Sequence, residues 1–188
     1  MADALESTQH YTYRDYLEFP ADMRCELVGG EIFMMASPSF WHQSVVVDMC
    51  GQLRDFFKGK PCRVVVAPFD VRLFAKKNES DDTVVQPDLM VICDKSKYED
   101  GRACKGAPDF AIEVLSDSTR SHDLLRKRAL YEKAGIREYW AVGMDLVLQY
   151  ALVDGAYVET VHPIRAEPLD LPVSLFDGCV LRFEPGAN

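Results

Sequence analysis

The chain has 188 residues, of which 48% are apolar, and its formal net charge is −9. This length and composition predict one core of ordinary size, and no stretch has the roughly 18 consecutive apolar residues that cross a bilayer. The acidic balance excludes a general nucleic-acid coat, because phosphate binding requires clustered Lys and Arg. We expect a single domain over residues 11–188, preceded by a flexible tail over residues 1–10.

The N-terminus and the cysteines indicate a cytoplasmic protein with reduced thiols. The first residues, Met-Ala-Asp-Ala-Leu-Glu-Ser, are acidic and lack the apolar segment of a signal peptide. No C-x-x-C pair occurs, and several cysteines lie inside apolar runs, where Cys acts as a small hydrophobe. We therefore expect free thiols and neither a disulfide nor a zinc framework. The six positions are Cys25, Cys50, Cys62, Cys93, Cys104 and Cys179.

The first half of the chain predicts two helices, a hairpin and three strands. Gly29-Gly30 supplies the tight turn of the hairpin. Ser37-Pro38 predicts a helix start, because Ser caps free amides and Pro suits the first helical position. His42 lies in the first turn of that helix, on its apolar face. The predicted elements are a helix within 11–19, a hairpin over 26–35, a helix over about 38–57, and strands over 63–67, 69–75 and 84–93.

The second half predicts one long helix and a meander of strands. Gly135 suits a left-handed cap at the end of the helix that follows Thr119. Asp154-Gly155 is a hairpin turn between two later strands. We expect the last region to pack back on the domain or on a second copy. The predicted elements are loops over 76–83 and 94–107, strands over 110–115, 138–142, 146–152 and 157–162, and a turn-rich region over 163–188.

Two carboxylates, Asp88 and Glu113, each lie in an apolar run that is typical of a strand covered on both faces. Burying a lone carboxylate costs free energy unless it meets a partner or a metal ion. If the two strands are neighbours, both side chains meet at one edge of a sheet. They then offer the oxygen ligands that Mg²⁺ prefers. The alternative is that both are capping or ion-pair carboxylates.

Lys127 lies in the helix that follows Glu113, in one stripe with Asp123 and Tyr131. Helical side chains lean toward the N-terminus, so this lysine reaches back to the end of the preceding strand. A cation beside two carboxylates and a metal positions water and offsets charge on a phosphoryl group. The alternative is an ordinary surface pair between Asp123 and Lys127. The other basic residues nearby indicate either a local basic face or a solvated helix with i to i+4 pairs.

Pro87-Asp88, Glu113-Val-Leu-Ser and the spacing from Asp123 through Lys127 to Tyr131 resemble the PD-(D/E)XK nuclease superfamily. The chain more closely resembles the Uma-two family of proposed restriction endonucleases, over about residue 11 to the C-terminus. No Gly-rich phosphate loop, G-x-S-x-G elbow or H-E-x-x-H motif is present. The motifs that carry the closer resemblance are Glu26-Leu-Val-x-Gly30, Ser37-Pro-x-x-x-His42, Pro87-Asp88, Glu113-Val-Leu-Ser and Gly135-x-x-Glu-Tyr139-Trp140.

The resemblance implies an α/β (mixed α+β) fold with a restriction-endonuclease-like core, a mixed sheet flanked by helices. It implies Mg²⁺, or Mn²⁺, held by Asp88 and Glu113, with Glu26 as an additional acid. The superfamily usually places its lysine two residues after the acid, where this chain has Leu115. Lys127 fits a displaced position on the next helix. His42 is either a structural residue or part of the pocket lining.

These observations predict a metal-dependent endonuclease that hydrolyses DNA phosphodiester bonds. The alternative from another class is a binding or assembly protein with little catalysis, which the net charge and the displaced lysine favour. A weaker option is acid–base hydrolysis of a sugar by the carboxylate pair. We expect a homodimer without a membrane partner, because the C-terminal strands offer more apolar surface than one small sheet needs.

Overall fold

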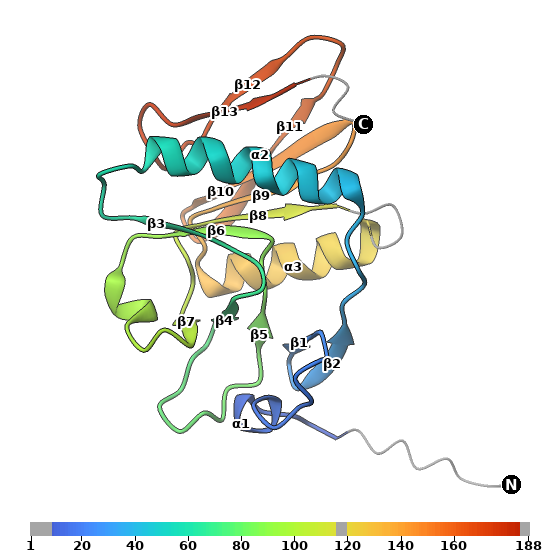
Figure 1. Cartoon of the computed structure of the whole chain (residues 1–188), viewed down its shortest axis with the longest axis vertical. Helices are drawn as coiled ribbons and strands as arrows, with labels where there is room; N and C mark the ends of the chain where they lie inside the picture. Colours follow the sequence, from blue (N-terminus) through green and yellow to red (C-terminus); the bar gives the residue numbers. More distant parts are fainter. Residues whose placement is uncertain (1–8, 116–119, 185–188) are drawn as a thin grey trace, which may run out of the picture.

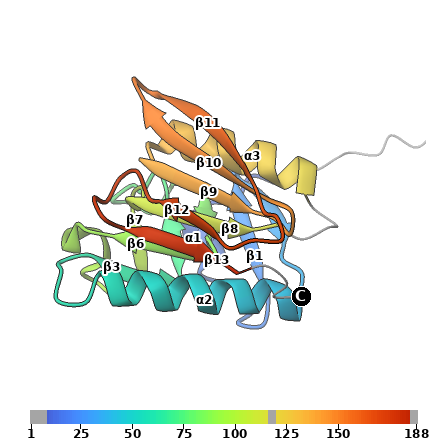
Figure 2. The same cartoon turned by 90° about the horizontal axis from the view of Figure 1, so that it is seen from above.

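The computed structural model describes residues 9–115 and 120–184, without the side chains of residues 120–123. A six-stranded sheet lies between two long helices, α2 (Phe40–Phe56) and α3 (Arg120–Ala134), as Figures 1 and 2 show. Its strands in spatial order are β11 (Ala156–Pro163), β10 (Leu146–Val153), β9 (Glu138–Val142), β8 (Phe110–Val114), β6 (Leu89–Ile92) and β3 (Arg63–Val66).

The β8–α3–β9 unit is a parallel crossover, whereas the other neighbours in this sheet are antiparallel. The sheet is therefore mixed, and the predicted mixed sheet flanked by helices is confirmed. A parallel pair needs a crossover of helical length, and residues 115–137 provide it. The crossover places the start of α3 near the carboxyl end of β8.

A second, five-stranded sheet packs beneath α3 (Figure 1). The N-terminal hairpin forms one end of it, as the Gly29-Gly30 turn predicted, and both glycines have positive φ. Ahead of it comes a short helix, α1 (Tyr13–Tyr16). The strands in spatial order are β2 (Glu31–Met34), β1 (Cys25–Val28), β5 (Val84–Val85), β4 (Asp70–Arg72) and β7 (Ala103–Lys105).

Two apolar clusters fill the faces of the main sheet. On one face, α2 packs with a terminal hairpin of β12 (Leu169–Pro172) and β13 (Val180–Phe183). Gln52 of α2 exchanges two hydrogen bonds with the Arg182 backbone, so the C-terminal region packs back on the domain. On the other face, α3 packs through Tyr131 between the two sheets. Among the described residues, no helix is long and apolar enough to cross a membrane.

The predicted turn between β10 and β11 and the predicted end of α3 are both confirmed. The hairpin of β10 and β11 turns at Asp154 and Gly155, whose φ values are 51° and 85°. These positive values match the paired left-handed residues of a type I′ turn. Gly135, with φ 83°, follows the last residue of α3. Residues 1–8 of the predicted tail lie outside the described residues.

The single strand predicted over 84–93 is wrong. β5 ends at Val85 and β6 begins at Leu89, and the two strands belong to different sheets. Pro87 lies in the break, because it has no amide hydrogen to donate to a ladder. The break leaves Asp88 at the start of β6, at the edge of the main sheet.

Two further boundaries differ from the predictions. The cap of α2 is Ser39, whose hydroxyl accepts from the His42 amide at 3.2 Å, so Ser37-Pro38 lies before the helix. The loop predicted over 94–107 contains a short 3-10 helix, η1 (Lys95–Tyr98), and strand β7. β7 pairs in parallel with β4, and this long-range pairing leaves no periodic signal in three residues.

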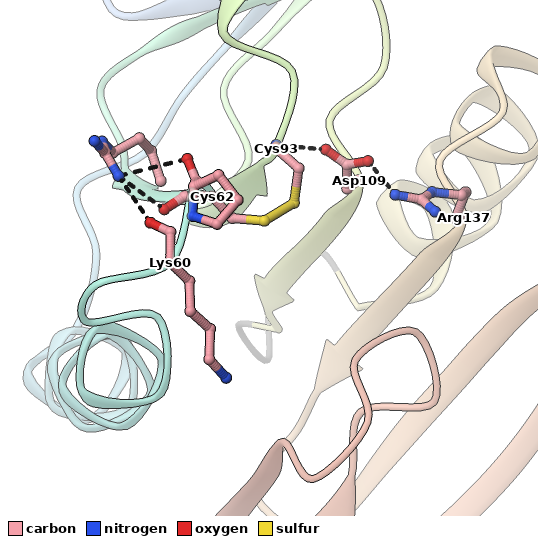
Figure 3. Close-up of a disulfide and its surroundings, with 7 residues drawn as sticks. Lys60, Cys62, Cys93, Asp109 and Arg137 are labelled. Atoms are coloured by element: carbon pink, nitrogen blue, oxygen red, sulfur yellow. Dashed lines mark hydrogen bonds and ion pairs between the residues drawn. A yellow bond between two sulfur atoms is a disulfide. The ribbon is translucent and has the colours of Figure 1, made fainter.

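Cys62 and Cys93 form a disulfide (Figure 3), so the prediction of free thiols is wrong at these positions. β3 and β6 are antiparallel neighbours, and Cys62 and Cys93 continue their register by one pair. Their separation of 31 residues gives no local motif. The other four cysteines are free. Beside the bridge, Asp109 accepts from the Cys93 amide at 2.7 Å and pairs with Arg137.

Candidate functional site

Asp88 and Glu113 lie opposite each other at one end of the main sheet. β6 and β8 are antiparallel with Leu89 opposite Ile112, and the next pair in this register is Asp88 and Glu113. Opposite residues of an antiparallel pair project from the same face. The Val114 amide donates to Asp88 Oδ2 at 2.8 Å, which ties Asp88 to the strand of Glu113. The neighbouring strands expected for this pair are therefore present.

Lys127 of α3 reaches the same end of the sheet. Its Nζ lies 2.9 Å from Glu113 Oε1 and 3.1 Å from Glu26 Oε1. Glu26 comes from β1, so the lysine joins carboxylates from two different sheets. Both acids are buried, with Glu26 5% and Glu113 7% exposed. The alternative prediction, a surface pair between Lys127 and Asp123, involves the Asp123 side chain, which lies outside the described residues.

Burial governs the protonation of this cluster. It raises the pKa of Glu113 to about 7, although the positive charge of Lys127 and the hydrogen bond from Tyr131 oppose the rise. Burial lowers the pKa of Lys127, but the charges of Glu113 and Glu26 outweigh burial and raise it. Burial also raises the pKa of Tyr131, so its hydroxyl keeps the proton that it donates to Glu113 Oε1 at 2.5 Å.

His42 contacts the other carboxylate of the pair. Its Nε2 lies 3.1 Å from Asp88 Oδ2, and this hydrogen bond raises the pKa of His42. Because α2 begins at Phe40, His42 is its third residue and its backbone amide is capped by Ser39. Nδ1 of His42 is buried and has no hydrogen-bond partner among the described residues. The structure thus places His42 beside Asp88, within hydrogen-bond distance of its carboxylate.

A polar network behind Glu26 was not predicted from the sequence. The Gln86 amide donates to Glu26 Oε1 at 2.9 Å. The Gln86 side chain donates to Asp70 Oδ1 at 2.8 Å and to the Tyr16 hydroxyl at 3.1 Å. Tyr16 also donates to Asp70 at 3.1 Å. The only sequence signal was the position of Gln86 directly before Pro87-Asp88.

The carboxylate pair fits a hard divalent cation. Asp88 Oδ1 and Glu113 Oε2 have no hydrogen-bond partner among the described residues, whereas Oδ2 and Oε1 hold the contacts above. Mg²⁺ is commonly held by one or two carboxylates together with water and phosphate oxygens. Over the ranges that the structure describes, no group of three or more His, Cys, Asp or Glu side chains is arranged to hold an ion. Any ion here therefore needs ligands besides these two acids.

The basic side chains that the structure describes in and just after α3 contact acids or aromatic rings. The Arg126 guanidinium lies 3.7 Å from the centre of the Phe33 ring, and Arg128 pairs with Glu132 at 3.9 Å, one turn apart. Arg137 pairs with the carboxylate beside the disulfide. The described part of the helix thus favours a paired and stacked surface over a free basic patch.

Comparison with known proteins identifies the family and the fold of the chain. No curated protein matches the chain. A solved structure described as "a putative nuclease belonging to DUF820 from Anabaena variabilis" matches with a TM-score of 0.67 and 17% identity. The match covers 86% of this chain and 89% of that one, and at this identity it shows a shared fold. The model of the family described as "Uma2: Putative restriction endonuclease" matches residues 12–182. The chain belongs to the Uma2 family.

Proposed function

We propose that this protein is a metal-dependent nuclease that hydrolyses DNA phosphodiester bonds at the sheet end formed by Asp88 and Glu113. One observation carries the proposal. Lys127 Nζ lies within 3.1 Å of two buried carboxylates, Glu26 and Glu113, directly beside Asp88. Three buried ionisable groups are costly to assemble for stability alone, because the desolvation penalty of their charged forms rivals their mutual attraction. Membership in the Uma2 family supports the same chemistry.

Asp88 and Glu113 are the residues that would hold Mg²⁺ or Mn²⁺. When bound, the ion polarises the phosphate and lowers the pKa of a coordinated water. Lys127 supplies a fixed positive charge that offsets the charge developing on the phosphoryl oxygens. Glu26 holds the lysine in place, and Tyr131 and His42 orient the two carboxylates.

A plasmid assay tests this proposal. Supercoiled DNA is incubated with Mg²⁺, Mn²⁺ or EDTA and with the wild type or Asp88→Ala. We expect nicking or linearisation by the wild type only with metal, and a loss of at least about 100-fold in the variant. Equal cutting by both proteins, or cutting in EDTA, would contradict the proposal.

A binding or assembly protein on the same fold is the second candidate. The net charge of −9 favours it, as do the ion pairs of Arg128 in α3 and of Arg137 after the helix, because both features weaken non-specific binding to DNA. Calorimetry distinguishes the two candidates. Binding of millimolar Mg²⁺ or Mn²⁺ supports the nuclease. No binding at millimolar concentration supports the second candidate.

We also propose a homodimer in the cytoplasm. The exposed valines of the outer strand β11 and its neighbour β10, Val153, Val158 and Val161, support a partner surface. Light scattering at micromolar concentration tests this, since a monomeric mass would contradict it. Disulfides are rare in the cytosol, so free Cys62 and Cys93 thiols in protein isolated under alkylation would support the location.

A further inference from the structure

A cavity of about 550 Å³ opens between α2 and the C-terminal strands, on the sheet face away from α3. Its apolar walls include Trp41, Met49 and Phe183, and Met144 lies at the turn after β9. Trp41 is half-buried, whereas Phe183 is 6% exposed. A flat ligand that stacks on an aromatic ring suits such walls.

Two charged side chains of the lining have no partner among the described residues. Asp48 of α2 and Arg165, two residues after β11, are exposed and make no hydrogen bond or ion pair with any described residue. In contrast, Arg182 and Glu184 of the same cavity pair with each other at 2.5 Å. A free carboxylate accepts from an amino group, and a free guanidinium binds a phosphate. The unpaired charges therefore suit a ligand with an amino-bearing flat body and an anionic group.

The cavity adjoins the carboxylate site. Its wall residue Val142 pairs in register with Val114, the residue after Glu113. The neighbour of Trp41 in α2 is His42, which contacts Asp88. The two sites thus share the end of the sheet, on opposite faces.

We propose that this cavity receives an unstacked nucleobase of the substrate strand. The base stacks on Trp41, its amino-bearing edge faces Asp48, and its flanking phosphate lies near Arg165. Adenine, cytosine and guanine carry such an amino group and thymine does not, so the cavity disfavours thymine. The proposal rests on the proposed nuclease function for its substrate class.

Tryptophan fluorescence gives a direct test, since the chain has two tryptophans and Trp140 is fully buried. The full-length protein in EDTA is titrated with dAMP, dCMP, dGMP, dTMP, deoxyribose 5-phosphate or inorganic phosphate. We expect saturable quenching by the three amino-bearing nucleotides, weaker quenching by dTMP, and none by the two controls. Trp41→Phe abolishes the response. Asp48→Asn removes the discrimination against dTMP, whereas Asp55→Asn, on the same helix outside the cavity, retains it.

Several results would overturn the proposal. These are no quenching, equal quenching by deoxyribose 5-phosphate, and an Asp48→Asn variant that discriminates as the wild type does. A fourth result would come from a chain without residues 185–188. If its Trp41 emission shifted while nucleotides had no effect, the cavity would be assigned to the chain's own C-terminal end. The titration needs no metal and no cleavage. Quenching without DNA cutting would therefore support base binding in the cavity and contradict the proposed nuclease function. Metal-dependent cutting without quenching would do the reverse.

Discussion

Three ionisable side chains from three different elements meet in the buried cluster of Glu26, Glu113 and Lys127. Each carboxylate is stabilised by the lysine, and Tyr131 adds a hydrogen bond to Glu113. Removing one member of such a cluster leaves the others buried without compensation. Stability and the proposed catalysis therefore depend on the same atoms, and variants must separate the two effects.

Glu113→Gln tests the raised pKa of this carboxyl. A folded-state pKa of about 7 exceeds the ordinary glutamate pKa of 4.5, so the folded protein holds this proton more tightly. The stabilising contribution is complete below about pH 4.5 and is lost as the pH rises to about 7. We expect Glu113→Gln to raise the free energy of unfolding at pH 8 by about 1–3 kcal/mol and to change it little at pH 4.5. Urea unfolding in EDTA measures both.

The matched control for that experiment is Glu31→Gln, an exposed acid of the N-terminal hairpin. It keeps the wild-type dependence of stability on pH. If Glu113→Gln lowered stability equally at pH 4.5 and pH 8, ionisation of Glu113 would not be the cause of the effect.

Lys127→Met leaves Glu26 and Glu113 without their cation. We expect a loss of about 3–5 kcal/mol in the free energy of unfolding and of about 100-fold or more in any DNA cleavage. The double variant Lys127→Met/Glu113→Gln recovers part of the stability, because it removes one of the stranded charges. Cleavage by folded Lys127→Met at the wild-type rate would show that the lysine acts only through folding.

At the level of helices and strands, the position of His42 depends on where α2 begins. Ser39 caps the helix through its hydroxyl, whereas Ser37 lies outside it. Ser39→Ala should lower the free energy of unfolding by about 1 kcal/mol, and Ser37→Ala should change it by much less. Chemical denaturation of both variants measures the difference. Equal losses would contradict the cap assignment.

The disulfide links the residue before β3 to the residue after β6, the strand that follows Asp88. Closing a loop of this length stabilises a chain by about 3–4 kcal/mol in the loop-entropy model. We expect Cys62→Ser, or reduction of the wild type, to lower the free energy of unfolding by up to that amount. Cys50→Ser, which removes a free thiol, serves as the control. A wild type whose stability is insensitive to reductant would contradict a role for the bridge in stability.

Local patterns predicted the long elements because propensity and packing agree there. The apolar face of α2, the glycine at the end of α3 and the Asp154-Gly155 turn are all visible within a few residues. The break at Gln86 to Asp88, strand β7 and the disulfide depend on pairing between distant segments. Such pairing leaves no local period, so the sequence shows it only indirectly.

For the whole molecule, the crossover of β8, α3 and β9 explains why a displaced lysine can belong to the site. Asp88 and Glu113 were predicted as site residues because each is a charge within an apolar run. Lys127 was predicted because of its place in the helix that follows Glu113. Gln86, Tyr16 and Asp70 were not visible, because they reach the cluster through a second sheet and a short helix. Contacts between residues that lie far apart along the chain leave no pattern that a single sequence can show.

The central claim is that Asp88 and Glu113 hold a divalent cation on which cleavage depends. Titration of the full-length protein with Mn²⁺, followed by electron paramagnetic resonance of the free ion, tests it most directly. We predict saturable binding in the wild type and in Asp55→Asn, and at least about tenfold weaker binding in Asp88→Ala and Glu113→Gln. Absence of binding at millimolar Mn²⁺, or equal binding by all four proteins, would contradict the claim.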